Sequence, residues 1–394
     1  MRLPPYLFAR LNALKLQKRR AGADIIDLGM GNPTDGAPQI VTDKLCEASR
    51  DPRNHRYSAS RGIKGLRREV AIKYKDKWNV ELDWQSEVLA CLGSKEGLSH
   101  MCLAMLGPGD TAIVPEPTFP IHNYGVALAG GNVISVRLGN DEAFLERIVD
   151  VCEHIYPKPK LLILNYPHNP TAMTVEEGFF ETVVDIAKRF GIAVIHDFAY
   201  GETCFDGYQP PSFLSARGAK DVGVEFITMS KPYNMAGFRV GFAAGNEEML
   251  DHLATIKGYY DYGIFQPLQI ASIIALRHCG QDVVEQNERY AVRRDIVCEG
   301  LEMIGWEVKK TRATMFVWAK APQEHLRGKG SIDYAMDLME HAEVAVAPGR
   351  AFGENGEDCF RIALVENEQR LRQAMRNIRR FIRDKPIRRG KKDR

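Results

Sequence analysis

The sequence predicts an α/β protein with a mostly parallel sheet and a smaller α+β domain. Three observations lead to this class. Short apolar segments alternate with helical ones over residues 87–246, a pattern typical of a parallel sheet covered by helices on both faces. Beyond about residue 275 a long charged helix is followed by short strands with helices between them. The length of 394 residues suits about two or three domains of ~100–200 residues each.

The predicted elements can be justified in chain order. Leu7, Leu11 and Leu14 share one face of a first amphipathic helix. Residues 25–38 predict a short strand that enters a Gly/Pro-rich loop, and residues 62–78 have helical spacing of apolar side chains. The apolar strands of the main sheet are predicted at 87–93, 111–117, 160–167, 192–200, 224–231 and 240–246, with helices at 94–106 and 176–191. The later domain has a helix near 282–304 and strands at 306–310, 315–320, 344–348 and 360–364.

Composition and charge exclude several classes of protein. Hydrophobic residues make up 45% and charged residues 26%, a globular mix that excludes a disordered chain. No apolar run approaches the ~20 residues that span a bilayer, so no membrane protein is expected. The net charge of +2 is unevenly distributed along the chain. The C-terminal segment, residues 370–394, contains twelve Lys/Arg and two acidic residues, whereas the rest of the chain contains 41 basic and 49 acidic residues. A solvated helix end explains this segment better than a nucleic-acid interface, and a tail that binds RNA or anionic lipid is the alternative.

The eight cysteines are scattered, without a C-x-x-C pair or a matching histidine spacing. The sequence therefore predicts neither a disulfide framework nor a metal site. Free thiols favour a reducing compartment, and we expect a cytoplasmic protein. The N-terminus is basic, but polar residues interrupt its apolar run, so an amphipathic helix is favoured over a transit peptide.

Polar side chains stand at the ends of predicted strands, where α/β sheets bind ligands. Lys231 ends a buried strand, where an unpaired ammonium is costly but an amine joined to a carbonyl cofactor as an imine is not. Eight residues later, Arg239 presents a group suited to phosphate. Asp197 ends the strand 192–200, and a carboxylate there can keep a pyridine nitrogen protonated, as pyridoxal phosphate requires. His122 is interpreted as a structural histidine that supports Asp197.

Two further motifs fit the same ligand. Asn169 in NYPHNPTA offers an amide to a phenolic oxygen. Ser94 and Lys95 follow a strand and open a helix, so their backbone N–H groups form an anion site. The segment is not a Walker loop, because G-x-x-x-x-G-K-[ST] is absent.

Together, S-K-x-x-N-M-A-G-x-R-x-G, H-N-P-T and D-x-x-Y resemble the motifs of fold-type I pyridoxal-phosphate aminotransferases of class I/II. The resemblance runs from about residue 5 to residue 382. The segments DLGMGNP, HRYSASRGI, GSKEGL and DYGIFQPLQ are also similar to bacterial alanine (glutamate–pyruvate) aminotransferases and to LL-diaminopimelate aminotransferases. The resemblance implies a large domain, residues 40–275, with a seven-stranded sheet. It also implies a small domain formed by residues 1–39 and 276–394.

The resemblance also implies a role for each motif residue. Lys231 would be the Schiff-base lysine and proton shuttle, Asp197 would pair with the ring nitrogen, and Asn169 and Tyr200 would bind the 3′-oxygen. The residues that hold the cofactor phosphate would be Ser94, Lys95, Thr228, Ser230 and Arg239, with Phe119 stacked on the ring. For the substrate, Arg361 would bind the α-carboxylate bidentately, beside Gly31 and Asn169. Tyr57 would reach the cofactor phosphate in the other subunit of a homodimer with shared active sites.

The predicted activity is a ping-pong exchange of an amino group between an L-amino acid, alanine or glutamate, and a 2-oxo acid, pyruvate or 2-oxoglutarate. Family resemblance places the distal pocket wall near Tyr6, Gly31, Phe119 and the partner's Tyr262–Ile264 stretch, with no arginine dedicated to a side-chain carboxylate. This wall favours alanine over diaminopimelate. The alternatives are an LL-diaminopimelate aminotransferase, a pyridoxal-phosphate-dependent lyase, and a non-enzymatic binding protein that uses the basic tail.

Overall fold

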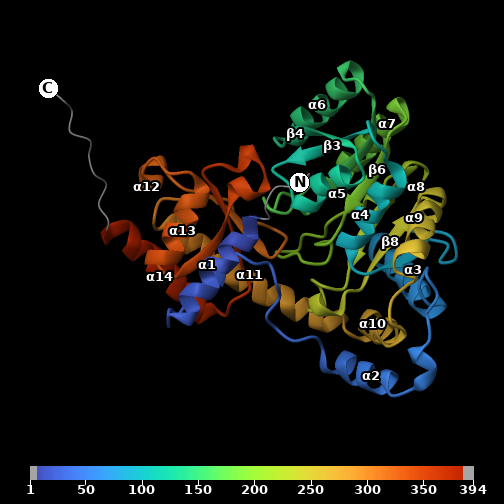
Figure 1. Cartoon of the computed structure of the whole chain (residues 1–394), viewed down its shortest axis with the longest axis horizontal. Coiled ribbons are helices and arrows are strands. Elements are labelled where there is room, and N and C mark those ends of the chain that lie inside the picture. Colours follow the sequence, from blue (N-terminus) through green and yellow to red (C-terminus); the bar gives the residue numbers. More distant parts are fainter. Residues whose placement is uncertain (1–6, 385–394) are drawn as a thin grey trace.

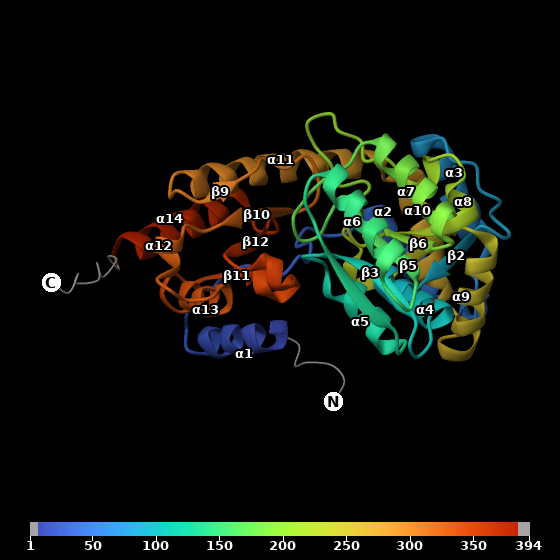
Figure 2. The same ribbon diagram turned by 90° about the horizontal axis from the view of Figure 1, so that it is seen from above.

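The computed structural model describes residues 7–384, which form two lobes joined by the long helix α11 (Gly280–Glu302) (Figures 1 and 2). The larger lobe contains a seven-stranded sheet and the smaller lobe a five-stranded sheet. The predicted α/β class with a second, smaller α+β part is therefore confirmed. The exact domain boundaries, at residues 39/40 and 275/276, stay a prediction.

The large sheet is mostly parallel, as predicted. Its strand order is β2-β8-β7-β6-β5-β3-β4, and only β8 runs antiparallel to its neighbours. Its strands are β2 (Val88–Cys91), β3 (Thr111–Glu116), β4 (Asn132–Arg137), β5 (Pro159–Asn165), β6 (Ala193–Asp197), β7 (Gly223–Thr228) and β8 (Gly241–Gly245). Residue patterning did not locate β4. This edge strand buries only Val136, so it lacks the continuous apolar run that marks the central strands.

Helices cover both faces of this sheet. Neighbouring residues of a strand point to opposite faces, so they pack against different layers of helices. Leu89 of β2 packs into one core with Leu98 and Leu250, whereas Val88 packs into the other with Val70 and Val183. The helices of this lobe are α2 (Gln39–Ser49), α3 (Lys64–Trp78), α4 (Ser94–Met105), α5 (Pro120–Leu128), α6 (Asp141–His154), α7 (Glu177–Phe190), α8 (Ala219–Val222), α9 (Glu247–Tyr260) and α10 (Gln266–His278). Sheet and helices together form the three layers of the larger lobe.

The strand register sets the position of the site. In the parallel strands β5 and β6, Asn165 pairs with Asp197, and Asp197 pairs in turn with Phe226 of β7. The carboxyl ends of these three strands therefore meet at one edge of the sheet. The loops that carry Asn169 and Lys231 leave from that edge, where parallel sheets bind ligands.

The smaller lobe combines both ends of the described chain. Its sheet has the order β1-β11-β12-β10-β9, and β1 pairs in parallel with β11, so that Ile26 lies opposite Val344. The strands are β1 (Ile26–Leu28), β9 (Glu307–Val308), β10 (Phe316–Lys320), β11 (Val344–Pro348) and β12 (Cys359–Ala363). Its helices, besides α11, are α1 (Leu7–Arg20), α12 (Gln323–Leu326), α13 (Ser331–His341) and α14 (Glu368–Asp384). Leu11 and Leu14 of α1 pack against this lobe, in agreement with the predicted amphipathic helix.

The basic C-terminal segment is helical as far as Asp384. In α14, Leu371, Met375, Ile378 and Phe381 are buried, so most of the arginines occupy the opposite face of the helix. The rest of the predicted basic tail, residues 385–394, lies outside the described residues. Over the described part of the chain, no helix is long and apolar enough to cross a bilayer.

Candidate active site

A cavity of about 410 Å³ lies at the carboxyl ends of β5, β6 and β7, where the two lobes meet. The residues that the sequence predicted to bind the cofactor and the substrate carboxylate line this cavity, except Tyr57, which was expected to act in the other subunit. These residues are Gly31, Ser94, Lys95, Phe119, Asn169, Asp197, Tyr200, Thr228, Ser230, Lys231, Arg239 and Arg361. The fold therefore gathers motifs that are more than 300 residues apart, such as Gly31 and Arg361, in a single cavity.

Lys231 lies in the turn after β7, and its ammonium donates a hydrogen bond of 2.6 Å to the carbonyl oxygen of Gly31. Burial, with the nearby Arg361 and Arg239, lowers the pKa of Lys231 to about 8. A lysine with an ordinary pKa is almost entirely protonated at neutral pH, whereas this one has a substantial neutral fraction. The neutral amine is the form that attacks a carbonyl group or accepts a proton.

If the cavity binds the pyridoxal phosphate that the sequence motifs imply, this lowered pKa predicts how the rate of cofactor capture depends on pH. Below pH 8 the capture rate constant should rise by about tenfold per pH unit, because the neutral fraction of Lys231 rises in proportion, and it should level off above pH 8. Stopped-flow absorbance of the protein mixed with cofactor measures this profile. A rate that continues to rise to pH 10 would indicate an ordinary lysine and contradict the assignment.

Asp197 ends β6 and is buried, with 8% of its surface exposed. Its Oδ2 lies 3.0 Å from His122 Nε2, and His122 Nδ1 lies 2.7 Å from Thr118 Oγ1. With the proton placed on Nε2, the imidazole donates to the carboxylate and accepts from the threonine hydroxyl, which satisfies all three groups. This agrees with the interpretation of His122 as a support for Asp197. Thr118 was not identified, because an isolated threonine in a loop carries no distinctive signal.

Arg361 reaches the cavity from β12 of the smaller lobe and is almost completely buried. Its Nη1 donates to Asn169 Oδ1 at 2.7 Å, and its Nη2 donates to the carbonyl oxygen of Gly29 at 3.0 Å. The guanidinium carbon lies 4.1 Å from the centre of the Phe316 ring. These contacts orient a planar donor suited to bidentate binding of a carboxylate.

Phe316 also explains why Gly31 is a glycine. A Cβ atom at this position would lie 2.5 Å from the Phe316 ring, so a side chain would displace the aromatic ring on which Arg361 rests. Phe316 is a site residue that sequence reasoning missed. In the segment MFVWAK it has the pattern of an ordinary strand residue, and its role becomes visible only when the strand is placed against the loop after β1.

The start of α4 has the features of the predicted anion site. Ser94 and Lys95 form its first turn, and Gly93 at the N-cap has a positive φ of 85°. Gly241 in β8 permits close packing here, since a Cβ atom would lie 2.6 Å from the backbone nitrogen of Ser94. The hydroxyl of Thr228 donates to Ser230 Oγ at 2.9 Å beside this turn. Backbone N–H groups and hydroxyls at a helix N-terminus are typical ligands of phosphate.

Arg239 completes this cluster with an unusual backbone conformation. Its φ of 57° lies in the left-handed region, which is costly for a residue with a side chain. The guanidinium donates to the carbonyl oxygens of Ala236 and Leu92, at 2.9 and 3.4 Å. Backbone strain of this kind is found at functional sites, where the surrounding structure maintains it.

The charges of the cavity lining favour an anionic ligand. Four cationic side chains, Lys95, Lys231, Arg239 and Arg361, line the cavity with a single carboxylate, Asp197. Burial and the proximity of Arg239 lower the pKa of Lys95, as expected for crowded cations. A phosphate monoester and a substrate carboxylate would compensate this excess of positive charge.

Phe119 and Tyr200 supply the remaining groups of the cavity. Phe119 is partly exposed at the start of α5, and Lys95 Nζ lies 5.7 Å from the centre of its ring. Burial raises the pKa of Tyr200, although Arg361 acts against the shift, so its hydroxyl remains protonated and able to donate. An aromatic face, a phenol, a carboxylate, an amine and a phosphate site together fit pyridoxal phosphate.

Tyr57 does not reach this cavity in its own chain. It is 89% exposed, and its ring packs edge-on against Tyr262 with 5.3 Å between centroids. Ile264, which was expected to line the partner's pocket, is 1% exposed and belongs to its own hydrophobic core. Tyr262 is therefore the accessible part of that stretch. Tyr6 lies outside the described residues.

One cluster among the described residues has the composition of a metal site, namely Glu96, His100 and Asp261. The ammonium of Lys257, which is fully buried, already lies 3.1 Å from Glu96 Oε1 and 2.7 Å from Asp261 Oδ2. Because a cation of the protein compensates these carboxylates, the cluster is explained as a buried ion-pair network.

Proteins of known family resemble this chain over nearly its whole length. A family described as "Aminotransferase class I and II" matches residues 23–378. The chain is 47% identical over 385 residues to the glutamate-pyruvate aminotransferase AlaC of Escherichia coli, covering 97% of this chain and 92% of that one. It is 41% identical over 380 residues to an LL-diaminopimelate aminotransferase of Moorella thermoacetica, covering 96% of each. Substrate-bound BacF from Bacillus subtilis has a similar structure, with a TM-score of 0.88, 34% identity and coverage of 96% and 95%.

Proposed function

Since the chain belongs to the class I and II aminotransferase family, we propose that it exchanges an amino group between alanine and 2-oxoglutarate, giving pyruvate and glutamate. It is a transaminase, and its cofactor is pyridoxal phosphate. This membership decides against the predicted alternatives of a lyase and of a non-enzymatic binding protein. The choice between alanine and diaminopimelate rests on the cavity.

The observation that carries the substrate proposal is the distribution of arginines around the cavity. Arg239 lies beside the anion site at the start of α4, and Arg361 is the group suited to a substrate α-carboxylate. Neither of these two arginines is then available to bind a second carboxylate on the side chain of a substrate. The cavity lining also includes the apolar side chains of Met30, Phe119 and Phe316, of which Phe316 lies against Arg361, and a small, mostly apolar wall suits alanine and pyruvate. Glutamate would be accepted through a mobile or water-mediated contact.

Each residue then has a task in the reaction. The bound cofactor acts as an electron sink, which lowers the cost of removing the proton from the substrate Cα. Lys231 Nζ would take that proton and deliver it to the C4′ position of the cofactor within the same half of the exchange, and the second half would reverse this transfer. Its pKa of about 8 suits a base at neutral pH. Asp197, supported by His122, places a negative charge next to the ring nitrogen. Arg361 holds the α-carboxylate so that the Cα–H bond points at the amine.

Measured specificity constants test this choice of substrate. We expect kcat/KM for alanine to exceed that for LL-diaminopimelate, because the distal ammonium and carboxylate of diaminopimelate would enter the apolar wall without partners. A panel of amino donors with pyruvate and 2-oxoglutarate as acceptors, followed by cofactor absorbance, measures both constants. If diaminopimelate is better than alanine by tenfold, about 1.4 kcal/mol in transition-state stabilisation, the order is reversed.

The exposed aromatic side chains around Tyr57 support a homodimer with shared active sites. Tyr57, Tyr259, Tyr260, Tyr262 and Phe265 are 89, 90, 66, 55 and 47% exposed. A monomeric protein rarely exposes so many large aromatic groups together, and such patches mark protein interfaces. In a symmetric dimer, the side chain of Tyr57 would extend across the interface to the anion site of the other subunit.

All eight cysteines are free thiols, which supports the proposed cytoplasmic location.

Mixed dimers test whether Tyr57 acts across the interface. Tyr57→Ala and Lys231→Ala are each expected to lose most activity as pure dimers. After unfolding, mixing and reassembly, mixed dimers should regain activity, about a quarter of the wild-type value for random pairing, because one site per mixed dimer is complete. Sedimentation at micromolar concentration measures the oligomeric state. A monomer, or mixing that restores nothing, would contradict the shared site.

A further inference from the structure

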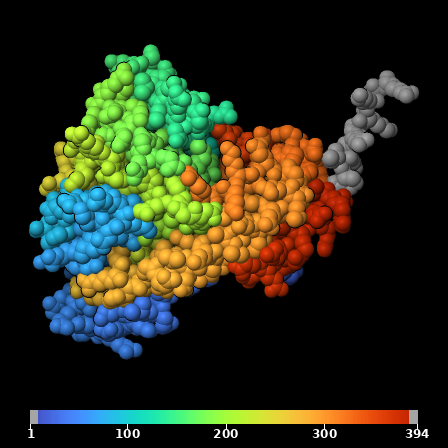
Figure 3. Space-filling model, turned by 180° about the vertical axis from the view of Figure 1, so that it is seen from behind, coloured from blue at the N-terminus to red at the C-terminus, as the bar shows by residue number. Residues whose placement is uncertain are grey.

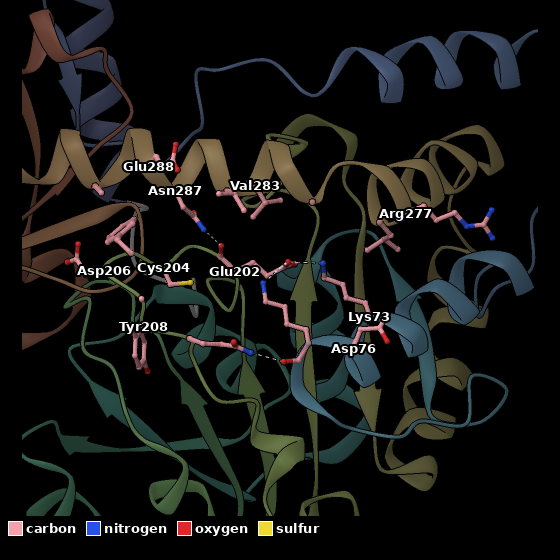
Figure 4. A pocket seen from close by; sticks show the side chains of 18 of the residues that line it. Lys73, Asp76, Glu202, Cys204, Asp206, Tyr208, Arg277, Val283, Asn287 and Glu288 are labelled. Atoms are coloured by element: carbon pink, nitrogen blue, oxygen red, sulfur yellow. Dashed lines mark hydrogen bonds and ion pairs between the residues drawn. The ribbon is translucent and has the colours of Figure 1, made fainter.

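A second, larger cavity lies outside the catalytic one. It is a groove of about 920 Å³ between α3, α11 and residues 202–209 of the loop after β6, and none of its lining residues lines the catalytic cavity. Figure 3 shows this face of the molecule, where orange α11 crosses from the smaller lobe to the larger one beside light-blue α3. In Figure 4, Lys73 of α3 and Glu202 of the loop point toward each other within the groove.

Lys73 connects two segments that carry catalytic residues. Its ammonium lies 2.7 Å from Glu202 Oε2 and donates a hydrogen bond of 2.8 Å to the hydroxyl oxygen of Tyr233. Glu202 follows Tyr200 by two residues, and Tyr233 follows Lys231 by two residues. Lys73, Glu202 and Tyr233, here named the Lys73 bridge, therefore join the loop after β6 to the loop after β7.

The bridge is buried and has a defined charge state. The side chains of Lys73 and Glu202 are 13 and 11% exposed, and Tyr233 is 2% exposed. Burial acts to raise the pKa of Glu202, but Lys73 and Lys77 outweigh it and hold that pKa below its usual value. Burial and Glu202 raise the pKa of Tyr233, so it remains a neutral phenol. The bridge thus consists of an ammonium between a carboxylate and a phenol oxygen, which is a strong, directional arrangement.

Helix α11 holds the same two segments from the other side of the groove. Asn287 Nδ2 donates to the carbonyl oxygen of Glu202 at 2.8 Å, and Gln286 Nε2 donates to the carbonyl oxygen of Lys231 at 2.6 Å. Figure 4 shows Asn287 reaching from α11 toward Glu202. The Tyr200–Glu202 and Lys231–Tyr233 segments are therefore each tied to both α3 and α11, while their catalytic side chains enter the other cavity.

We propose that Lys73 is a positioning residue of the transaminase reaction, which fixes the segment of Lys231 relative to that of Tyr200 without contacting the substrate. The inference rests on the proposed function, because it assumes that Lys231 moves a proton. Displacing a proton-transferring group by a fraction of an ångström costs rate more than binding. Arg361, which binds the substrate carboxylate, belongs to the other lobe and is not part of the bridge.

The test compares Lys73→Met and Tyr233→Phe with the control Lys75→Met. Lys75 lies on the same helix and pairs with Glu81 at the surface, with both side chains about half exposed or more. Lys73→Met should lower kcat by about tenfold and leave KM for the amino donor within about twofold. It should also move the pH at which the absorbance of the bound cofactor titrates, a readout that needs no turnover. Lys75→Met should change neither quantity.

Tyr233→Phe removes only the hydrogen bond between Lys73 and the Lys231–Tyr233 segment and keeps the Lys73–Glu202 ion pair. It therefore tests the bridge even if Lys73→Met does not fold. It should lower kcat in the same way, and the double variant should be no slower than Lys73→Met alone, because both changes interrupt a single connection. Wild-type kcat and an unmoved absorbance titration in a folded Lys73→Met or Tyr233→Phe protein would overturn the proposal. If the wild-type protein turned over no amino donor, the proposed function would fail, while the absorbance titration would still decide the bridge.

Discussion

Replacing Lys231 with alanine is expected to abolish transamination and to leave the fold intact. The side chain supplies both the amine that engages the cofactor carbonyl and the base that moves the Cα proton, so the loss should be roughly 10⁴-fold or more. In the structure this amine has a lowered pKa, a hydrogen bond to Gly31 and a place among the cations of the cavity. The measurement is the turnover of alanine with added cofactor.

Thermal unfolding is the companion measurement for this variant. The pKa of Lys231 is about 8 in the folded protein, below the ordinary value of 10.5. The unfolded chain therefore binds more protons between these values, stability rises with pH across that window, and below pH 8 the buried charge destabilises the fold. Removing the ammonium at pH 7 should not lower the melting temperature. Lys188→Ala, at a surface ion pair with Asp221, is the matched control and should keep full activity. Turnover by the Lys231 variant would disprove the assignment.

Replacing Asp197 with alanine should preserve cofactor binding through Lys231 and slow proton transfer by several orders of magnitude, about 10³-fold or more. Without the carboxylate the pyridine nitrogen loses the partner that keeps it protonated, and the ring withdraws electrons less effectively. The His122 side chain, which is completely buried, would also lose its hydrogen-bond partner. Single-turnover absorbance with alanine measures the proton-transfer step directly.

The control for this variant is Asp221→Ala, which removes an exposed carboxylate paired with Lys188. It should retain the wild-type rate. A near-wild-type rate for Asp197→Ala, with cofactor bound, would show that this carboxylate does not support the electron sink. Loss of cofactor binding would instead show that Asp197 anchors the ring more than it activates it.

Much of the larger lobe was predictable because its central strands are buried on both faces. Strands β5, β6 and β7 appear as continuous apolar runs, and the polar residues at their ends, Asp197 and Lys231, stand out for that reason. Strand β4 escaped prediction because an edge strand needs no such run. The pairing of β1 with β11 could not be predicted either, because a three-residue strand has no sequence pattern that indicates which strand it pairs with.

The sequence alone predicted the fold class, which the structure confirms, and it pointed to Lys231, Asp197 and the start of α4 as candidate site positions, because burial and strand ends leave local patterns. Which distant side chains meet became visible only in the tertiary structure. Arg361 contacts Asn169 across 192 positions, Phe316 packs against Gly31, and Lys73 bridges to Tyr233 across 160 positions. Such contacts depend on how two lobes and several loops pack, and packing follows shape and volume over the whole molecule. No short stretch of sequence contains that information.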